Sequence, residues 1–141
     1  MTPIDPRERF GGAFAASVCC MDGRIQLPII RFIQERYGVR FVDIITEPGP
    51  IRYLADRKNH SVLETIRKRL QISVEVHGSR IIAVSGHHDC AGNPAPKRAQ
   101  LEQLARSVKT LRSWGFEDRT LVKLWVNKRW EVDIIDEWIE R

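Results

Sequence analysis

Two short stretches of this 141-residue chain gather residue types that can do metal or thiol chemistry. The first holds Cys19, Cys20, Asp22 and Arg24 within six residues, and the second is Gly-His-His-Asp-Cys at residues 86–90. The chain has three cysteines, so a disulfide framework would leave one over. In a reducing compartment the remaining roles for a cysteine are metal ligand, nucleophile or buried apolar side chain.

Metal binding would require the two stretches to meet in space. Cys20 ends a predicted strand, and His87 and Cys90 follow another one, with two residues between them so that a tight turn can aim both at one ion. The carboxyl ends of neighbouring parallel strands lie at the same edge of a sheet, so the three side chains converge if these strands are neighbours. Two thiolates and one imidazole favour Zn²⁺ and leave the fourth tetrahedral position open, as in catalytic zinc sites. A single cysteine or histidine is more often structural, and that alternative stays open.

Asp22 and Arg24 follow Cys20 in the loop that leads to a predicted helix. Asp22 could cap that helix or fill a turn. Beside a metal it could instead occupy the fourth position, or pair with Arg24 and leave that position to water, which it could then orient or deprotonate. Both arrangements are consistent with the residues alone.

The hydrophobic pattern places both stretches at strand ends in a chain that alternates strand and helix. The expected elements are strands at residues 13–20, 40–46, 80–85 and 120–126, helices at 27–37, 61–77 and 97–114, and an alternating strand at 129–134. Residues 47–50 (Glu-Pro-Gly-Pro) should interrupt regular structure, and residues 136–141 should form a helical turn. The prediction is a single α/β domain over residues 1–141. Its mostly parallel open sheet has four strands in the order 2-1-3-4, with an antiparallel edge strand and helices on both faces.

The composition limits the classes of function to consider. A hydrophobic content of 43% is that of a globular protein, and no apolar run approaches the ~18 residues of a membrane helix. The net charge of +5 raises nucleic acid as a partner, but the basic residues are spread along the chain without a nucleic-acid-binding signature. We therefore expect a cytoplasmic protein with a small-molecule substrate and neither a nucleic-acid nor a membrane partner. Four tryptophans near the C-terminus (Trp114, Trp125, Trp130 and Trp138) fit either core packing or a subunit interface.

Both stretches also resemble motifs of one known family. Residues 20–24 (Cys-Met-Asp-Gly-Arg) resemble the C-x-D-x-R motif of the beta-class carbonic anhydrases, and residues 86–90 resemble their G-H-x-x-C motif. The resemblance implies that Cys20, His87 and Cys90 are zinc ligands and that Asp22 and Arg24 form a gating pair at the fourth position. It also implies reversible hydration of CO2 to bicarbonate by zinc-bound hydroxide, in a homodimer or higher homo-oligomer.

Three features depart from the family pattern. The family usually has Arg-Asn-Ala where this chain has Glu47-Pro48-Gly49-Pro50, which suggests an acidic, rigid pocket lining. The N-terminal segment is short for the family's helical arm, and Gly23 replaces a serine or alanine. Alternative hypotheses are therefore the same zinc site acting on carbonyl sulfide or carbon disulfide, a non-catalytic zinc-binding scaffold, and a metal-free redox pair of Cys20 and Cys90. Cys19 should be buried on the opposite face of its strand, and His88 could replace His87 as a ligand.

Overall fold

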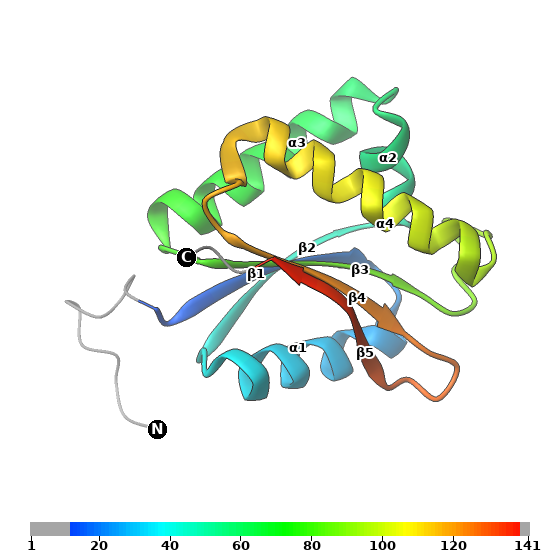
Figure 1. Ribbon diagram of the computed structural model, residues 1–141, viewed down its shortest axis with the longest axis horizontal. Helices are drawn as coiled ribbons and strands as arrows, with labels where there is room; N and C mark the ends of the chain where they lie inside the picture. The colour runs from blue at the N-terminus through cyan, green and yellow to red at the C-terminus, as the bar shows by residue number, and fades with distance from the viewer. Residues whose placement is uncertain (1–11, 139–141) are drawn as a thin grey trace.

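The protein folds around one five-stranded sheet. The structure, a computed structural model, describes the backbone of residues 12–138 and the side chains of residues 12–137. The sheet order is β2-β1-β3-β4-β5, with the first four strands parallel and the last antiparallel (Figure 1). The strands are β1 (Phe14–Cys20), β2 (Phe41–Glu47), β3 (Ile81–His87), β4 (Thr120–Val126) and β5 (Val132–Trp138). The predicted fold class and strand order are confirmed.

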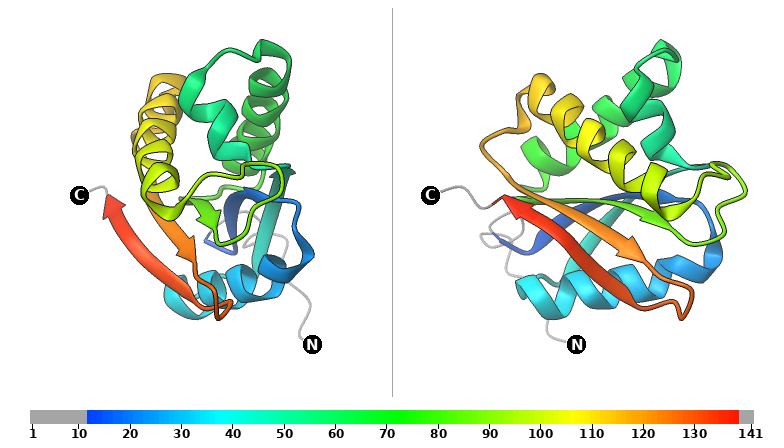
Figure 2. Two further views of the ribbon diagram at one scale, coloured as in Figure 1. Left: turned by 90° about the vertical axis from the view of Figure 1, so that its right-hand side faces the viewer. Right: turned by 45° about the vertical axis from the view of Figure 1, so that its right-hand side comes forward.

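Helices cover both faces of this sheet, as expected. Helix α1 (Gly23–Tyr37) lies on one face, while α2 (Pro50–Asp56), α3 (His60–Gln71) and α4 (Lys97–Leu111) lie on the other, which the two turned views of Figure 2 also show. The sheet therefore separates two apolar clusters, one beneath each helical layer. None of the helices in residues 12–138 is long and apolar enough to cross a membrane.

Helix α1 begins four residues earlier than its hydrophobic pattern predicted, at Gly23 instead of Leu27. Its buried face consists of Ile25, Ile29 and Ile33 at a four-residue spacing, whereas Leu27 is 57% exposed. The first turn was missed because its polar side chains serve the site instead of the core. Asp22 caps the helix by accepting a hydrogen bond from the backbone N–H of Arg24.

Residues 47–50 join β2 to a helix that the sequence analysis did not predict. Pro50 is the first residue of α2, a position where a backbone N–H has no partner within the helix and proline costs nothing. The seven-residue helix buries Pro50, Ile51 and Leu54. The segment does end β2, as predicted, but the sequence analysis missed α2, which packs against α4 above the sheet.

The C-terminal segment also differs from its prediction. A turn at residues 127–131 uses the Asn127 side-chain oxygen to accept the backbone N–H groups of Arg129 and Glu131. Strand β5 therefore starts at Val132 instead of Arg129, and it continues through residues 136–138, where a helical turn was expected. The last three residues of that predicted turn lie outside the described residues.

Candidate metal centre

The fold brings the three predicted metal ligands together at the carboxyl edge of the sheet. Cys20 is the last residue of β1, His87 is the last residue of the neighbouring strand β3, and Cys90 follows three residues later. Their ligand atoms all lie within 4.8 Å of one another, and the two sulfur atoms are 3.8 Å apart. Each residue is at most 5% exposed. The predicted convergence of residues 67 positions apart in the chain therefore occurs.

The His87 ring is oriented for metal binding through Nε2. Its Nδ1 lies 2.7 Å from the carbonyl oxygen of His88, so the Nδ1–H donates there and Nε2 carries the lone pair. That Nε2 is buried and has no hydrogen-bond partner, which is unusual for a buried polar atom. His88 itself is exposed and does not belong to the cluster, so the alternative of His88 as the ligand finds no support in the geometry.

Gln100 of α4 fixes the backbone of His87 from behind. Its Oε1 accepts the backbone N–H of His87 at 3.2 Å, and its Nε2 donates to the carbonyl oxygens of His87 and Ala95, each at 3.0 Å. Gln100 is 1% exposed. A Cβ at Gly86 would lie 2.7 Å from Gln100 Oε1, so the absence of a side chain there makes room for this clamp. The sequence pattern did not indicate Gln100 as a site residue, because it occupies an ordinary buried position of a helix.

The surroundings of the two thiols differ in what they do to ionisation. Burial raises the pKa of Cys20, but the His87 imidazole, the backbone N–H groups of Gly49 and Asp22 and the Cys90 thiol outweigh burial and lower it to about 7. Burial and the neighbouring Cys20 raise the pKa of Cys90 to about 11. Burial lowers the pKa of His87, but Cys20 and the His88 carbonyl outweigh burial and raise it. One thiolate therefore forms near neutral pH, whereas a second one needs a nearby cation.

These donors fit a soft divalent metal ion. Two sulfurs and one imidazole nitrogen form the donor type that zinc prefers, and the unpartnered Nε2 of His87 faces the thiols. Cys19 lies outside the cluster, fully buried, with its sulfur 3.8 Å from Gln26 Oε1. Burial raises the pKa of Cys19 to about 11, which fits its predicted role in packing.

The Asp22 carboxylate pairs with Arg24 and is not part of the three-residue cluster. Arg24 Nε donates to both carboxylate oxygens at 3.1 and 3.2 Å, and Nη2 donates to Oδ2 at 2.7 Å. Hydrogen bonds from Arg24 lower the pKa of Asp22 to about 2, against a smaller opposing effect of burial. Of the two arrangements that the sequence left open, the structure contains the pair.

Arg24 is held by two further residues that the sequence analysis missed. Its Nη1 donates to Asp89 Oδ2 at 3.2 Å and its Nη2 donates to the Asp89 carbonyl at 3.1 Å. The guanidinium lies 4.3 Å from the ring centroid of Trp130, in the turn between β4 and β5. Asp89 could have been noticed because it lies between two ligands, whereas nothing in the sequence around Trp130 pointed to the site.

The loop at residues 47–50 forms another wall of the centre, with a different electrostatic character from the predicted one. The Glu47 carboxylate pairs with Arg69 of α3 at 2.5 Å, so the expected acidic lining is neutralised. The backbone N–H of Gly49 lies 3.4 Å from the Cys20 sulfur, to which it donates. A Cβ at Gly49 would lie 2.5 Å from the Cβ of Asn93, so this loop packs directly against the one that carries Cys90.

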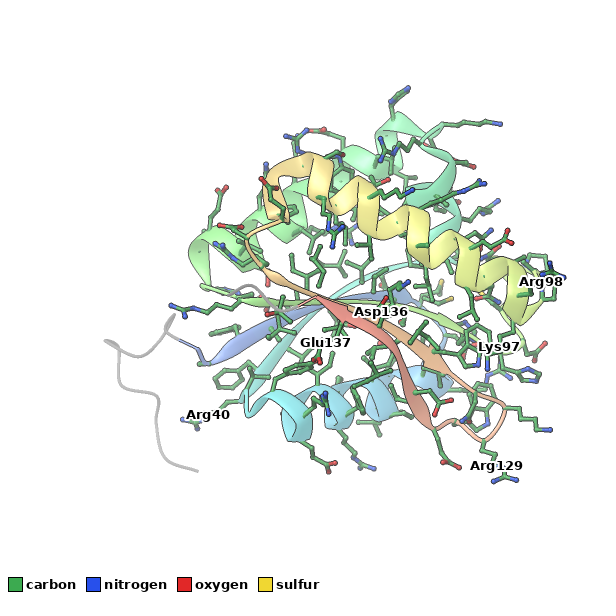
Figure 3. The ribbon with its side chains drawn as sticks, in the orientation of Figure 1. Arg40, Lys97, Arg98, Arg129, Asp136 and Glu137 are labelled. Carbon is green, nitrogen blue, oxygen red and sulfur yellow. The ribbon has the colours of Figure 1, made fainter. Side chains whose placement is uncertain are left out.

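A cavity of about 470 Å³ lies beside Cys90, beneath the start of α4. Buried Trp125 and Gln100 contribute to its walls, and exposed Lys97 extends over the Trp125 ring at 5.7 Å. Figure 3 shows Lys97 and Arg98 at this end of the molecule, together with Arg129 of the β4–β5 turn.

The four tryptophans near the C-terminus do not share one role. Trp125 is in the core, Trp130 contacts Arg24 and Trp114 packs against an apolar cluster, while the side chain of Trp138 lies outside the described part.

Comparisons with known proteins identify a family and similar folds. The family model described as "Putative carbonic anhydrase" matches residues 10–136. The fold is similar to that of beta-carbonic anhydrase isoform I from Trichomonas vaginalis, with 16% identity, a TM-score of 0.59, and coverage of 96% of this chain and 87% of that one. It is also similar to tetrameric beta-carbonic anhydrase from the ascomycete Sordaria macrospora, with 11% identity, a TM-score of 0.53, and coverage of 94% and 86%. Among curated protein sequences, none matches this chain.

Proposed function

This chain belongs to the beta-class carbonic anhydrase family as a short, divergent member, and from this premise we propose that it is a zinc-dependent lyase. The proposed reaction is the reversible hydration of CO2, in which CO2 and water give bicarbonate and a proton. One observation carries the proposal. Asp22 follows Cys20 by two residues but pairs with Arg24, so the protein supplies a cluster of three ligand atoms to which the Asp22 carboxylate does not belong.

Each site residue then has a definite role. Cys20, His87 and Cys90 would hold the zinc ion, which supplies a Lewis acid that makes water nucleophilic near neutral pH. Asp22 stays ionised because Arg24 stabilises its charge, so it can accept a hydrogen bond from the attacking water and orient it. The Gly49 N–H stabilises the Cys20 thiolate, and Gln100 keeps His87 in position.

The three alternative hypotheses make different demands on the same residues. A non-catalytic scaffold would use Asp22 as a fourth permanent ligand, and its pairing with Arg24 argues for the lyase instead. A disulfide-forming pair of Cys20 and Cys90 would have no use for the unpartnered Nε2 of His87. Carbonyl sulfide and carbon disulfide are small, apolar substrates like CO2, and the cavity beside Cys90 has room for any of the three.

We also propose that the protein works as a homodimer or a higher homo-oligomer. The support is the family membership and the tetrameric state of the Sordaria macrospora enzyme. The small-molecule substrate, the lack of a nucleic-acid or membrane partner and the cytoplasmic location stay predictions from the sequence. Size-exclusion chromatography with light scattering measures the assembly, and a monomer at all concentrations would contradict the oligomer.

Metal analysis and a hydration assay test the function together. We expect about one zinc per chain and faster CO2 hydration than buffer. Cys20→Ala should abolish both, whereas Cys19→Ala is the matched control, because it removes an equally buried thiol from the adjacent position but leaves the cluster intact. Zinc-loaded protein that is no faster than buffer from pH ~6 to ~9 would contradict the lyase. Parallel assays with carbonyl sulfide and carbon disulfide decide the substrate.

A further inference from the structure

Beyond the motif residues, two further side chains hold the half-exposed guanidinium of Arg24. Two of its guanidinium nitrogen atoms, Nε and Nη2, donate to Asp22, while Nη1 donates to the side chain and Nη2 to the carbonyl of Asp89. The guanidinium carbon of Arg24 lies over the Trp130 ring, 4.3 Å from the ring centroid. These contacts come from three separate loops, which follow β1, β3 and β4. Arg24 would otherwise be a long, 45% exposed side chain with much conformational freedom.

The backbone at both supporting residues is in an unfavourable conformation. Asp89 has φ of 58° and Trp130 has φ of 61°, in the left-handed region. Among residues 12–138, one other non-glycine residue has a positive φ, namely Arg57, which ends helix α2 in a common way. For a bulky tryptophan this conformation costs energy that only the surrounding structure can offset. Both residues contact the guanidinium of Arg24.

We infer that Asp89 and Trp130 are positioning residues that fix Arg24 and thereby keep the Asp22 carboxylate turned away from the three-ligand cluster. The inference rests on the proposed function, since a lyase needs the fourth coordination position of the metal to be open to water. The physical reason is preorganisation. An arginine already ordered by Asp89 and Trp130 loses little further freedom when it pairs with Asp22, so the pair forms more readily. A mobile Arg24 would compete less well with a metal ion for the same carboxylate.

Nuclear magnetic resonance of the metal-free protein tests the first half of this inference. The Arg24 Nε–H should exchange slowly with water and give a distinct signal, because it donates to Asp22 and the guanidinium contacts the Trp130 ring. Trp130→Leu should speed that exchange by roughly 3- to 30-fold, the effect of losing one cation–π contact, and Trp130→Phe should largely retain the protection. Arg69 is an internal control, because its Nε donates to the Thr65 carbonyl far from Trp130. Unchanged Arg24 exchange in Trp130→Leu would overturn the inference, whatever the enzyme's activity.

Asp89→Asn is a second variant with little risk to folding. The Asp89 side chain is 70% exposed, and asparagine tolerates a positive φ. This change removes the charge but keeps the backbone carbonyl that accepts from Nη2, so a smaller acceleration of about 2- to 5-fold is expected. Exchange as slow as in the wild type would remove Asp89 from the proposal.

Anion binding to the cobalt-substituted protein tests the second half. Azide should perturb the visible spectrum of wild-type protein, because the fourth position is accessible, and Trp130→Leu should weaken azide binding by roughly 3- to 30-fold as Asp22 turns toward the metal. Adding Asp22→Asn to Trp130→Leu should restore azide binding, since the competing carboxylate is then gone. A general loss of structure would not be rescued in this way, so failure of the rescue overturns the positioning role. CO2 hydration measured separately shows whether the proposed function stands, and its failure alone leaves both spectroscopic results intact.

Discussion

Substituting Gly49 by alanine should destabilise the protein far more than the same change at Gly38. Both glycines have nearly the same left-handed backbone, with φ of 62° and 65°. A Cβ at Gly38 meets nothing within 4 Å, whereas one at Gly49 would lie 2.5 Å from Asn93 Cβ and 3.0 Å from both Asn93 N and Gly92 C. Comparing Gly38→Ala with Gly49→Ala therefore separates the free-energy cost of the backbone conformation from the cost of disturbing the close packing between loops.

The magnitude follows from adding these two costs. Placing alanine in a left-handed conformation costs about 1–2 kcal/mol, and this is all that Gly38→Ala should lose. Gly49→Ala should lose the same free energy of unfolding for its backbone conformation. It also forces neighbouring atoms to move, which in a tightly packed region costs about 1–3 kcal/mol more. Two of the three crowded atoms belong to the backbone of the loop that follows Cys90, so a side-chain rotation alone cannot relieve the overlap. We expect a total loss of about 2–5 kcal/mol for Gly49→Ala.

Urea unfolding of the metal-free variants at one temperature measures both losses. Zinc retention after dialysis is a second readout, because a displaced 92–93 segment moves Cys90 and withdraws the Gly49 N–H from the Cys20 sulfur. Gly38→Ala should retain wild-type zinc content, since Gly38 ends helix α1 at the opposite edge of the sheet. Equal free energies of unfolding for the two variants would refute the claim that the 47–50 loop and the Cys90 loop are packed in contact.

Three further predictions concern the surroundings of the site. Gln100→Leu should cost about 2–4 kcal/mol and weaken zinc binding, because it leaves the buried backbone groups of His87 unpaired; urea unfolding and metal titration measure this, and an unchanged zinc affinity would contradict the clamp. Glu47→Gln should change CO2 hydration less than about two-fold, since Arg69 already neutralises that carboxylate; a larger change in kcat/KM would support the interpretation of an acidic pocket lining. Burial and the adjacent Glu137 carboxylate raise the pKa of Tyr37 in the folded protein, so stability is full below the unfolded pKa of about 10 and falls as pH rises above it. Tyr37→Phe should reduce the alkaline loss of stability measured by urea unfolding between pH ~8 and ~11, while the buried thiols of Cys19 and Cys90, whose pKa is also raised, cause the remainder; an identical pH profile would refute the role of Tyr37.

The sequence was sufficient to predict most of the sheet, because each parallel strand is a short apolar run bounded by glycine, proline or polar residues. It was also sufficient for the three-ligand cluster, since Cys20 and His87 end strands that are neighbours in the common open-sheet order. Helix α2 was missed because proline and glycine were taken as interruptions, although proline at a first helical position is favourable. The start of α1 was missed because the pattern was read on Leu27, which is exposed.

The residues that hold the ligands were harder to foresee, for a physical reason. Gln100 and Trp130 act on the site through contacts between segments that are distant in sequence, and no local periodicity records such contacts. The role of Glu47 was misjudged for the same reason, because its partner Arg69 lies on another helix. Ligand chemistry is specified by residue type, whereas ligand orientation is specified by tertiary packing.

Residues with positive φ lie at both edges of the sheet, but they differ in type between the two edges. At the amino edge, the loops that enter the strands use glycines at residues 12, 38, 78 and 115, which adopt this conformation without steric cost. At the carboxyl edge, the loops after β2, β3 and β4 use Gly49, Asp89 and Trp130. A glycine at residue 89 or 130 would fold at lower conformational cost, so the strain there is offset by what the side chains contact. Both contact Arg24, while Gly49 contacts Cys20 through its backbone. Of the three non-glycine residues with positive φ in the described part of the chain, Arg57 ends helix α2, and the other two hold Arg24 at the candidate metal centre.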